Sequence, residues 1–183
     1  MSGIRVARRY AKGLLAVAVE ERKIADYGRE LEAVAGLLTG HAELRNVVTN
    51  PLHDRSSRRA ILDILIKKLS TSPVMSQFLR LALDKGRLRH LPAIASAYQR
   101  LVDDHTNVGR ATVSAAVSIP PAAQSRIKDA LESATGKTII LTVNQDPGLI
   151  GGIKAKIGDL VLDGSIKTQL EGLKNSLKRG EAV

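Results

Sequence analysis

The sequence has no cysteine and almost no aromatic residues: three Tyr, one Phe and no Trp in 183 residues. Without cysteine there are no disulfides, thiolate metal sites or cysteine nucleophile. With so few aromatic side chains, the core must consist of aliphatic residues and alanine, which suits close helix packing. Recognition of nucleic acid by base stacking is also unsupported.

Long apolar runs are missing as well. The longest uninterrupted run is Leu14 to Val19, whereas a membrane-spanning helix needs roughly 20 apolar residues. The first nineteen residues contain no acid and carry several basic side chains, a pattern shared with targeting peptides. A structural amphipathic helix is favoured instead, because acids follow directly at Glu20 and Glu21 and apolar residues recur at helical spacing: Ile4, Ala7, Ala11, Leu14 and Ala18.

What remains is the composition of a basic globular protein. Apolar residues make up 44% and charged residues 25%, which is ordinary usage for one or two folded domains. Lys and Arg number 28 against 18 acids, a formal charge of +10, as in many nucleic-acid-binding proteins. The basic residues are scattered, however, and the longest clusters are the pairs Arg8-Arg9, Arg58-Arg59 and Lys67-Lys68.

The pattern is helical as far as residue 106. A second helix has its apolar stripe at Ile24, Tyr27, Leu31, Val34 and Leu38 and can end at Gly40. Asn50-Pro51 breaks the chain after a short third piece. Asp54, Ser56 or Ser57 can cap a fourth helix, and Ser72-Pro73 begins a fifth.

The fifth helix is apolar on more than one side. Its first stripe is Val74, Phe78, Leu81 and Lys85, and its second is Leu79, Ala82 and Leu83. Such a helix has two surfaces to pack against. A sixth helix follows from Leu91-Pro92 to His105, so we predict a bundle of six helices over residues 1–106.

From residue 107 the apolar period changes to two, which predicts a small α+β domain over 107–183 with the order β-α-β-β-β-α. The first strand covers 111–117, and Pro120-Pro121 opens a helix that Gly136 ends. Further strands are predicted over 138–143, 153–157 and 160–162, with the last two forming a hairpin. A final helix from about Ser165 carries apolar residues at helical spacing: Ile166, Leu170, Leu173 and Leu177.

No set of residues predicts catalysis, a metal or a cofactor. Gly136-Lys137-Thr138 is similar to the end of a phosphate-binding loop, but Leu131 stands where such a loop needs glycine. The glycines of 148–152 precede a strand and indicate a turn. Histidines 41, 53, 90 and 105 lack paired ligand spacing.

The first and fifth helices have more apolar surface than a bundle seam requires. A groove between them can accept an amphipathic partner helix. The alternative is that these faces complete the bundle core. A second alternative for the whole protein is a basic RNA-binding module, in which Arg58, Arg59, Lys67 and Lys68 contact phosphates.

Several segments, in this order along the chain, resemble the delta subunit of F-type ATP synthases, which is related to the mitochondrial oligomycin-sensitivity-conferring protein. The first are Val6 to Lys12, Asn50-Pro51, Phe78-Leu79, Lys85 to Leu88 and Leu91-Pro92. The most specific lie in the second domain: Asp146, Pro147, Ile150, Gly151 and Gly152, then Gly158 and Asp159, then Asp163 and Gly164.

The resemblance implies a non-catalytic stator subunit without cofactors, which links the peripheral stalk to the top of the catalytic head. It implies that residues 1–106 receive the amino-terminal helix of an alpha subunit in a groove lined by Tyr10, Ala11, Leu14, Phe78, Leu79 and Ala82. It also implies that residues 107–183 meet the end of the b subunit, for which we expect Leu170, Leu173 and Leu177. The expected location is the cytoplasmic side of a bacterial inner (plasma) membrane, as a peripheral protein.

Overall fold

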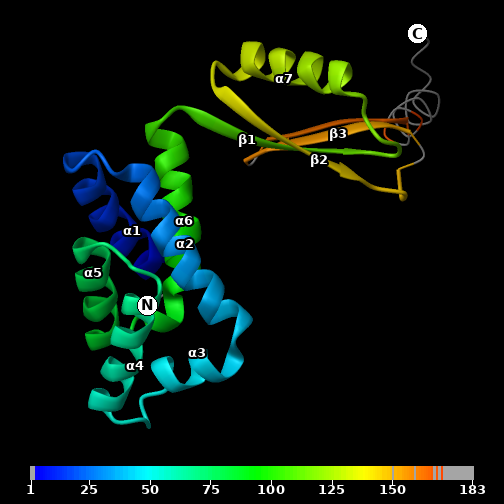
Figure 1. Cartoon of the computed structure of the whole chain (residues 1–183). Coiled ribbons are helices and arrows are strands. Elements are labelled where there is room, and N and C mark those ends of the chain that lie inside the picture. Colours follow the sequence, from blue (N-terminus) through cyan, green and yellow to red (C-terminus); the bar gives the residue numbers. More distant parts are fainter. Residues whose placement is uncertain (1–2, 150, 159, 167, 169, 171–183) are drawn as a thin grey trace. The chain divides into compact units, whose positions relative to one another are not determined.

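The computed structural model describes residues 3–149, 151–158, 160–166, 168 and 170 (Figure 1). The chain divides into two compact units, Met1–Val102 and Asp103–Val183, which we call the helical unit and the α+β unit. A helical first part followed by a small α+β part is as predicted. The division falls inside the last helix of the first unit, before the boundary predicted after residue 106.

The described part of the helical unit consists of helices joined by short connections. They are α1 (Gly3–Glu20), α2 (Ile24–Gly40), α3 (Ala42–Thr49), α4 (Arg55–Lys68), α5 (Pro73–Asp84), the short 3-10 helix η1 (Leu88–His90) and α6 (Leu91–His105). The turn η1 has no counterpart in the sequence prediction, because three residues are too few for a periodic pattern to register.

Local capping residues set the helix starts. Ser72 precedes α5, and its hydroxyl oxygen accepts a hydrogen bond from the backbone N–H of Met75 at 3.3 Å. Among the three candidates before α4, Asp54 is the cap, since its carboxylate accepts from the N–H of Ser56 at 3.0 Å. Both contacts satisfy an N–H that has no partner within the helix.

A single apolar cluster fills the helical unit and includes residues of α1 to α6 and η1. Tyr98 is 1% exposed, and its hydroxyl donates to the backbone carbonyl of Ile24 at 2.9 Å. The predicted stripe of α1 is wrong at its first position, because Ile4 is 78% exposed and Val6 is buried. The remaining members, Ala7, Ala11, Leu14 and Ala18, are buried.

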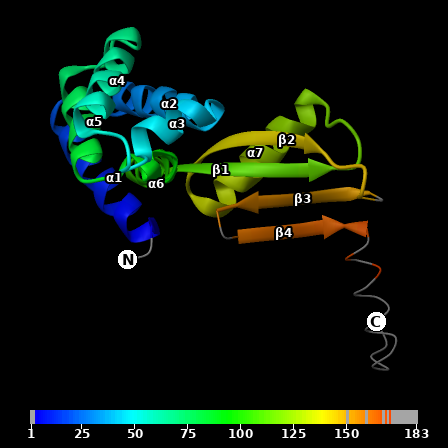
Figure 2. The same cartoon turned by 90° about the horizontal axis from the view of Figure 1, so that it is seen from below.

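The α+β unit has a mixed four-stranded sheet (Figure 2). Its described elements are β1 (Val108–Ala115), α7 (Pro121–Thr135), β2 (Thr138–Gln145), β3 (Gly152–Ile157) and β4 (Leu160–Ser165). The strand order is β2-β1-β3-β4. β1 and β2 are parallel, while β1 pairs with β3 and β3 with β4 in antiparallel fashion.

Helix α7 packs its Leu131 against Ala111 and Ile139 on one face of the sheet. Alternate β1 residues such as Arg110 and Thr112 lie on the opposite face and are exposed. Leu160 and Leu162 of β4 are 51% and 44% exposed. The described part of the α+β unit therefore buries less of its apolar surface than the helical unit does.

Residues Ile166, Thr168 and Leu170 are helical, as predicted for a helix starting near Ser165. Leu173 and Leu177 lie outside the described residues.

Candidate docking groove

A groove of about 680 Å³ lies between α1 and α5. Each helix contributes residues spaced three or four apart, so one continuous face of each helix forms a wall. The lining residues are Arg9, Tyr10, Gly13, Leu14 and Val17 from α1, and Val74, Gln77, Phe78, Leu81 and Lys85 from α5 and the residue after it.

The middle of the groove is apolar. The rings of Tyr10 and Phe78 meet edge to face, with centroids 6.2 Å apart and planes at 73°, a favourable geometry for an aromatic pair. Val17 and Leu81 remain 36% and 49% exposed, whereas Leu14 is only 3% exposed. Leu14 therefore lies at the bottom, and Val17 and Leu81 offer the apolar surface that a partner can cover.

Tyr10, Leu14 and Phe78 are brought together as predicted, but three other predicted groove residues are not in its lining. Ala11, Leu79 and Ala82 are 0% exposed and belong to the core. α5 has two apolar stripes, and Leu79 and Ala82 occupy the inner one. No partner can contact side chains that the fold already encloses.

The sequence prediction missed Val17, Val74 and Leu81 as groove residues, together with the polar Arg9, Gln77 and Lys85. A signal for the α5 members exists, since Val74, Phe78, Leu81 and Lys85 are spaced by 4, 3 and 4 residues. Periodicity identifies this stripe but does not show that it is the outer one.

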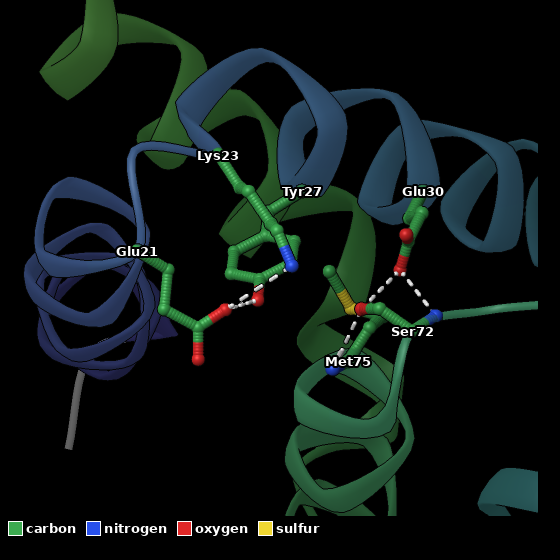
Figure 3. A network of polar contacts seen from close by, with 6 residues as sticks. All are labelled: Glu21, Lys23, Tyr27, Glu30, Ser72 and Met75. Atoms are coloured by element: carbon green, nitrogen blue, oxygen red, sulfur yellow. Dashed lines mark hydrogen bonds and ion pairs between the residues drawn. The ribbon is translucent and has the colours of Figure 1, made fainter.

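The start of α5 is tied to α2 by a carboxylate (Figure 3). One oxygen of Glu30 accepts hydrogen bonds from the Ser72 backbone N–H at 3.0 Å and from the Ser72 hydroxyl at 2.8 Å. A negative charge is favourable at a helix amino terminus. Glu30 therefore helps to hold the wall of the groove that α5 provides.

Beside this contact lies a second cavity of about 430 Å³, lined by charged residues of both signs. Arg29 pairs with Asp26, and Lys23 lies 3.8 Å from Glu21. The hydrogen bond between Tyr27 and Glu21, together with burial, raises the pKa of Tyr27 to about 12. The hydroxyl thus stays protonated as a donor, and the network joins the ends of neighbouring helices.

The predicted motif residues of the α+β unit build turns. A carboxylate oxygen of Asp146 accepts from the N–H of Gly148 at 2.9 Å, in the turn after β2 that contains Pro147. A Cβ added to Gly152 would lie 2.3 Å from the Gly164 carbonyl oxygen, so the absence of a side chain at Gly152 allows β3 and β4 to approach. A Cβ added to Gly151 would lie 2.6 Å from the end of the Ile166 side chain. These residues have a structural role.

The same hairpin contains Asp163, whose carboxylate accepts from the N–H of Ser165 at 3.0 Å. Hydrogen bonds from the Ser165 backbone and hydroxyl lower the pKa of Asp163, and Lys154 at 3.7 Å adds to the effect. Gly158 turns the chain between β3 and β4 with φ of 57°. Ile150 and Asp159, also part of the motif, lie outside the described residues.

The basic pairs considered for RNA binding lie at the two ends of α4, Arg58-Arg59 in its first turns and Lys67-Lys68 in its last. Asp63 lies between the two pairs on α4 and contacts Arg80 of α5 at 2.9 Å. Arg55, at the start of α4, contacts Asp84 of α5 at 2.8 Å. The basic residues of α4 therefore do not form one continuous phosphate-binding strip.

Two further kinds of feature, a metal centre and a membrane-spanning helix, are absent from the part of the chain that the structure describes. It contains no group of three or more residues placed to hold a metal ion. Nor does it contain a helix with both the length and the apolar character needed to cross a bilayer.

Comparison with known proteins gives consistent matches over nearly the whole chain. The family model described as ATP synthase delta (OSCP) subunit matches residues 6–177. The ATP synthase subunit delta of Desulfatibacillum aliphaticivorans is 44% identical over 183 residues, covering 100% of both chains. That of Desulfosudis oleivorans is 42% identical over 178 residues, covering 97% of each.

A similar fold occurs in a chain of the cryo-EM structure of the Toxoplasma gondii mitochondrial ATP synthase hexamer. The TM-score is 0.68 at 21% sequence identity, with 93% of this chain and 96% of that chain covered. At this identity the likeness concerns the fold alone.

Proposed function

This chain belongs to the ATP synthase delta (OSCP) subunit family, and we propose that its groove between α1 and α5 is the joint through which it acts as a stator. Members of this family are non-catalytic subunits of F-type ATP synthases, peripheral parts of a membrane-bound complex. In the proposed role the chain links the peripheral stalk to the top of the catalytic alpha/beta head. The head then stays still while the rotor turns, and proton-driven rotation is coupled to ATP synthesis.

The observation that carries the proposal is that the outer apolar stripe of α5 and the groove-lining face of α1 form the two walls of one groove. Leu81 and Val17 expose apolar surface on either side of the Tyr10–Phe78 pair. An amphipathic helix laid in such a groove buries its own apolar stripe against both walls. We assign this place to the amino-terminal helix of the alpha subunit.

A stator joint has to withstand torque without performing chemistry. What it requires is slow dissociation, which depends on a well-packed contact. A pre-formed groove between two helices of one core meets this need, because little has to be reordered on binding.

The α+β unit provides the second joint in this proposal, with the carboxy-terminal end of the b subunit. Leu170 is 57% exposed and helical. We propose that the predicted helix continues through Leu173 and Leu177 and that these leucines form the contact. In a bacterium this places the chain at the cytoplasmic face of the inner (plasma) membrane, which fractionation with the assembled synthase would check.

Titration calorimetry with a peptide of the alpha subunit's first ~20 residues tests the first joint, a length that gives roughly five helical turns. We expect saturable one-to-one binding to the whole chain. Leu81→Glu and Val17→Glu should each weaken binding at least about tenfold, since each puts a charge where the partner's apolar stripe would be buried. Leu14→Glu is unsuitable because Leu14 is 3% exposed and a buried charge would disturb folding.

Ile64→Glu is the matched control. Ile64 is 64% exposed on α4 and absent from the groove lining, so the same kind of substitution should leave affinity within about twofold. Equal binding by Leu81→Glu and wild type would refute the groove assignment. If the wild type binds no peptide but binds RNA with a steep dependence on salt, the basic RNA-binding module is favoured instead.

For the second joint, Leu170→Glu should weaken capture by a b-subunit fragment. The control is Val117→Glu, at a position of the same unit that is 71% exposed. Equal loss in both variants, or in neither, would contradict the contact at Leu170.

A further inference from the structure

The two ends of the groove differ in charge. α1 and α5 run antiparallel, because Tyr10 meets Phe78 while Gly3 lies beside His90, beyond the end of α5. Arg9 and Lys85 consequently both lie on the side of the Tyr10–Phe78 pair toward the start of α1, and Val17 and Val74 lie on its other side. We call the first the basic end.

No acid lines the groove. For Arg9 and Lys85 the structure shows no ion pair or side-chain hydrogen bond within the described residues. The nearest acid in sequence, Asp84, is occupied, since its carboxylate lies 2.8 Å from Arg55 and its pKa is lowered chiefly by that contact. Three other arginines of the helical unit, Arg29, Arg55 and Arg80, do pair with carboxylates.

We propose that Arg9 and Lys85 determine which helix the groove accepts, by pairing with carboxylates on the turn of the partner helix that lies at the basic end. The inference rests on the proposed function and adds the partner's charge to it. Apolar burial then gives most of the affinity, and the basic end sets register and orientation. A helix with the same apolar stripe but no acid at that position is disfavoured.

Charged groups at the rim of an interface act mainly on the rate of association and on its salt dependence. Each exposed ion pair changes affinity by up to about fivefold. Two such positions together predict about a tenfold effect at low salt. The effect should shrink as added salt shortens the range of the interaction.

The experiment measures binding of the alpha amino-terminal peptide to the whole chain, in wild type, Arg9→Gln, Lys85→Gln and the double variant, at low and high salt. A second peptide has every Asp and Glu replaced by the matching amide. We expect the double variant to lose about tenfold toward the natural peptide at low salt. The amide peptide should bind weakly to wild type and show no further loss in the variants, which is the signature of direct coupling.

Lys12→Gln is the matched control, because Lys12 is an exposed lysine of the same helix outside the lining. It should behave as wild type, apart from the small effect of net charge. Equal losses in Lys12→Gln and Arg9→Gln would show that only overall charge matters and would overturn the proposal.

Failure of this inference is distinguishable from failure of the proposed function. The natural peptide could bind the double variant as tightly as wild type but fail to bind Leu81→Glu. That result would support the groove assignment and overturn the role of the basic end. An alpha amino terminus with no acid at all would do the same. Absence of peptide binding by wild type would overturn both.

Discussion

The helical unit and the α+β unit bury their apolar residues in different ways. In the helical unit a single cluster joins residues of α1 to α6 and η1. In the described part of the α+β unit the buried residues fall into two smaller clusters on the face of the sheet that α7 covers. The helical unit thus has a continuous core with a groove on its surface, whereas the stability of the α+β unit depends on close backbone approach in the hairpin as well as on burial.

Leu79 and Leu81 of α5 provide the sharpest test of the helical unit. Leu79 is 0% and Leu81 49% exposed. Leu79→Ala should lower the free energy of unfolding of the helical unit by about 2–5 kcal/mol, because it leaves a cavity in the core. Leu81→Ala should cost under about 1 kcal/mol and instead weaken peptide binding.

Peptide-resolved amide hydrogen exchange is the measurement, since it reports each unit separately. Exchange in α1 to α6 should accelerate in Leu79→Ala while β1 to β3 stay unchanged. Faster exchange in both units would show that they unfold together and would contradict the independent stability of the two cores.

Gly152→Ala is the corresponding change in the α+β unit. Gly152 has φ of 82°, and an added Cβ would lie 2.3 Å from the Gly164 carbonyl oxygen. A left-handed conformation costs a side-chain-bearing residue roughly 1–2 kcal/mol, and the contact with backbone adds to it. We expect β3 and β4 to lose exchange protection while the helical unit keeps its own.

Gly158→Ala separates the two causes, because Gly158 has φ of 57° and open space around a Cβ. It should cost only the conformational part, about 1–2 kcal/mol. Equal effects at both positions would rule out the close backbone approach as the reason for glycine at 152.

Gly13→Ala should change stability and binding in opposite directions. Gly13 lies in α1 and in the groove lining, and an added Cβ meets nothing within 4 Å. Alanine in a helix interior is favoured over glycine by about 0.5–1 kcal/mol, so the free protein should become more stable. The added methyl occupies the groove, so calorimetry should show a several-fold weaker peptide complex.

Gly36→Ala in α2 is the matched control, with equally open space and no place in the groove lining. It should stabilise the helical unit by a similar amount without changing affinity. An unchanged affinity in Gly13→Ala would contradict close approach of a partner helix at this position.

The smallest expected effect concerns pH. Burial lowers the pKa of His90 below its ordinary value of 6.5, with help from Arg89 and Arg87. The unfolded chain therefore binds this proton more readily. The stability associated with neutral His90 is fully present above pH 6.5 and is lost as pH falls toward the lowered value.

Denaturant unfolding of the helical unit between about pH 7.5 and about pH 5.5 should show this decline, and His90→Gln should flatten it. His53→Gln, in the exposed turn before α4, serves as the control and should keep the wild-type slope. Asp54 and Asp84, whose pKa values are lowered by hydrogen bonds from Ser56 and Arg55, contribute only at more acidic pH. A slope that persists in His90→Gln would refute the assignment to His90.

Much of the secondary structure was predictable because its signals are local. Ser72-Pro73 begins α5, Gly136 ends α7 with φ of 66°, and the alternation around Val113 identifies β1. The turn η1 was missed, as was the burial of Val6 in place of Ile4. The turn η1 is too short for a periodic pattern to register, and whether Ile4 or Val6 is covered depends on the elements that α1 packs against.

The candidate site was only half predictable. Tyr10, Leu14 and Phe78, which the sequence grouped together, line the same groove, and the sequence also identified both stripes of α5. It assigned Leu79 and Ala82 to the partner, although the fold buries them completely. Both stripes are largely apolar and both recur at helical spacing, so periodicity does not distinguish the stripe that faces the core from the one that faces the groove.

The sequence by itself determined which segments form helices and strands, that the chain has a helical part and an α+β part, and to which family it belongs, because caps, periodicity and motifs act over a few residues. Element bounds shifted, since β1 is Val108–Ala115 rather than 111–117. Only the tertiary structure decided that Leu81 and Val17 face outward, that Arg9 and Lys85 line one groove on the same side of the Tyr10–Phe78 pair, and that Gly152 lies against the Gly164 backbone. These relations join residues far apart in the chain, and they arise from how whole elements pack.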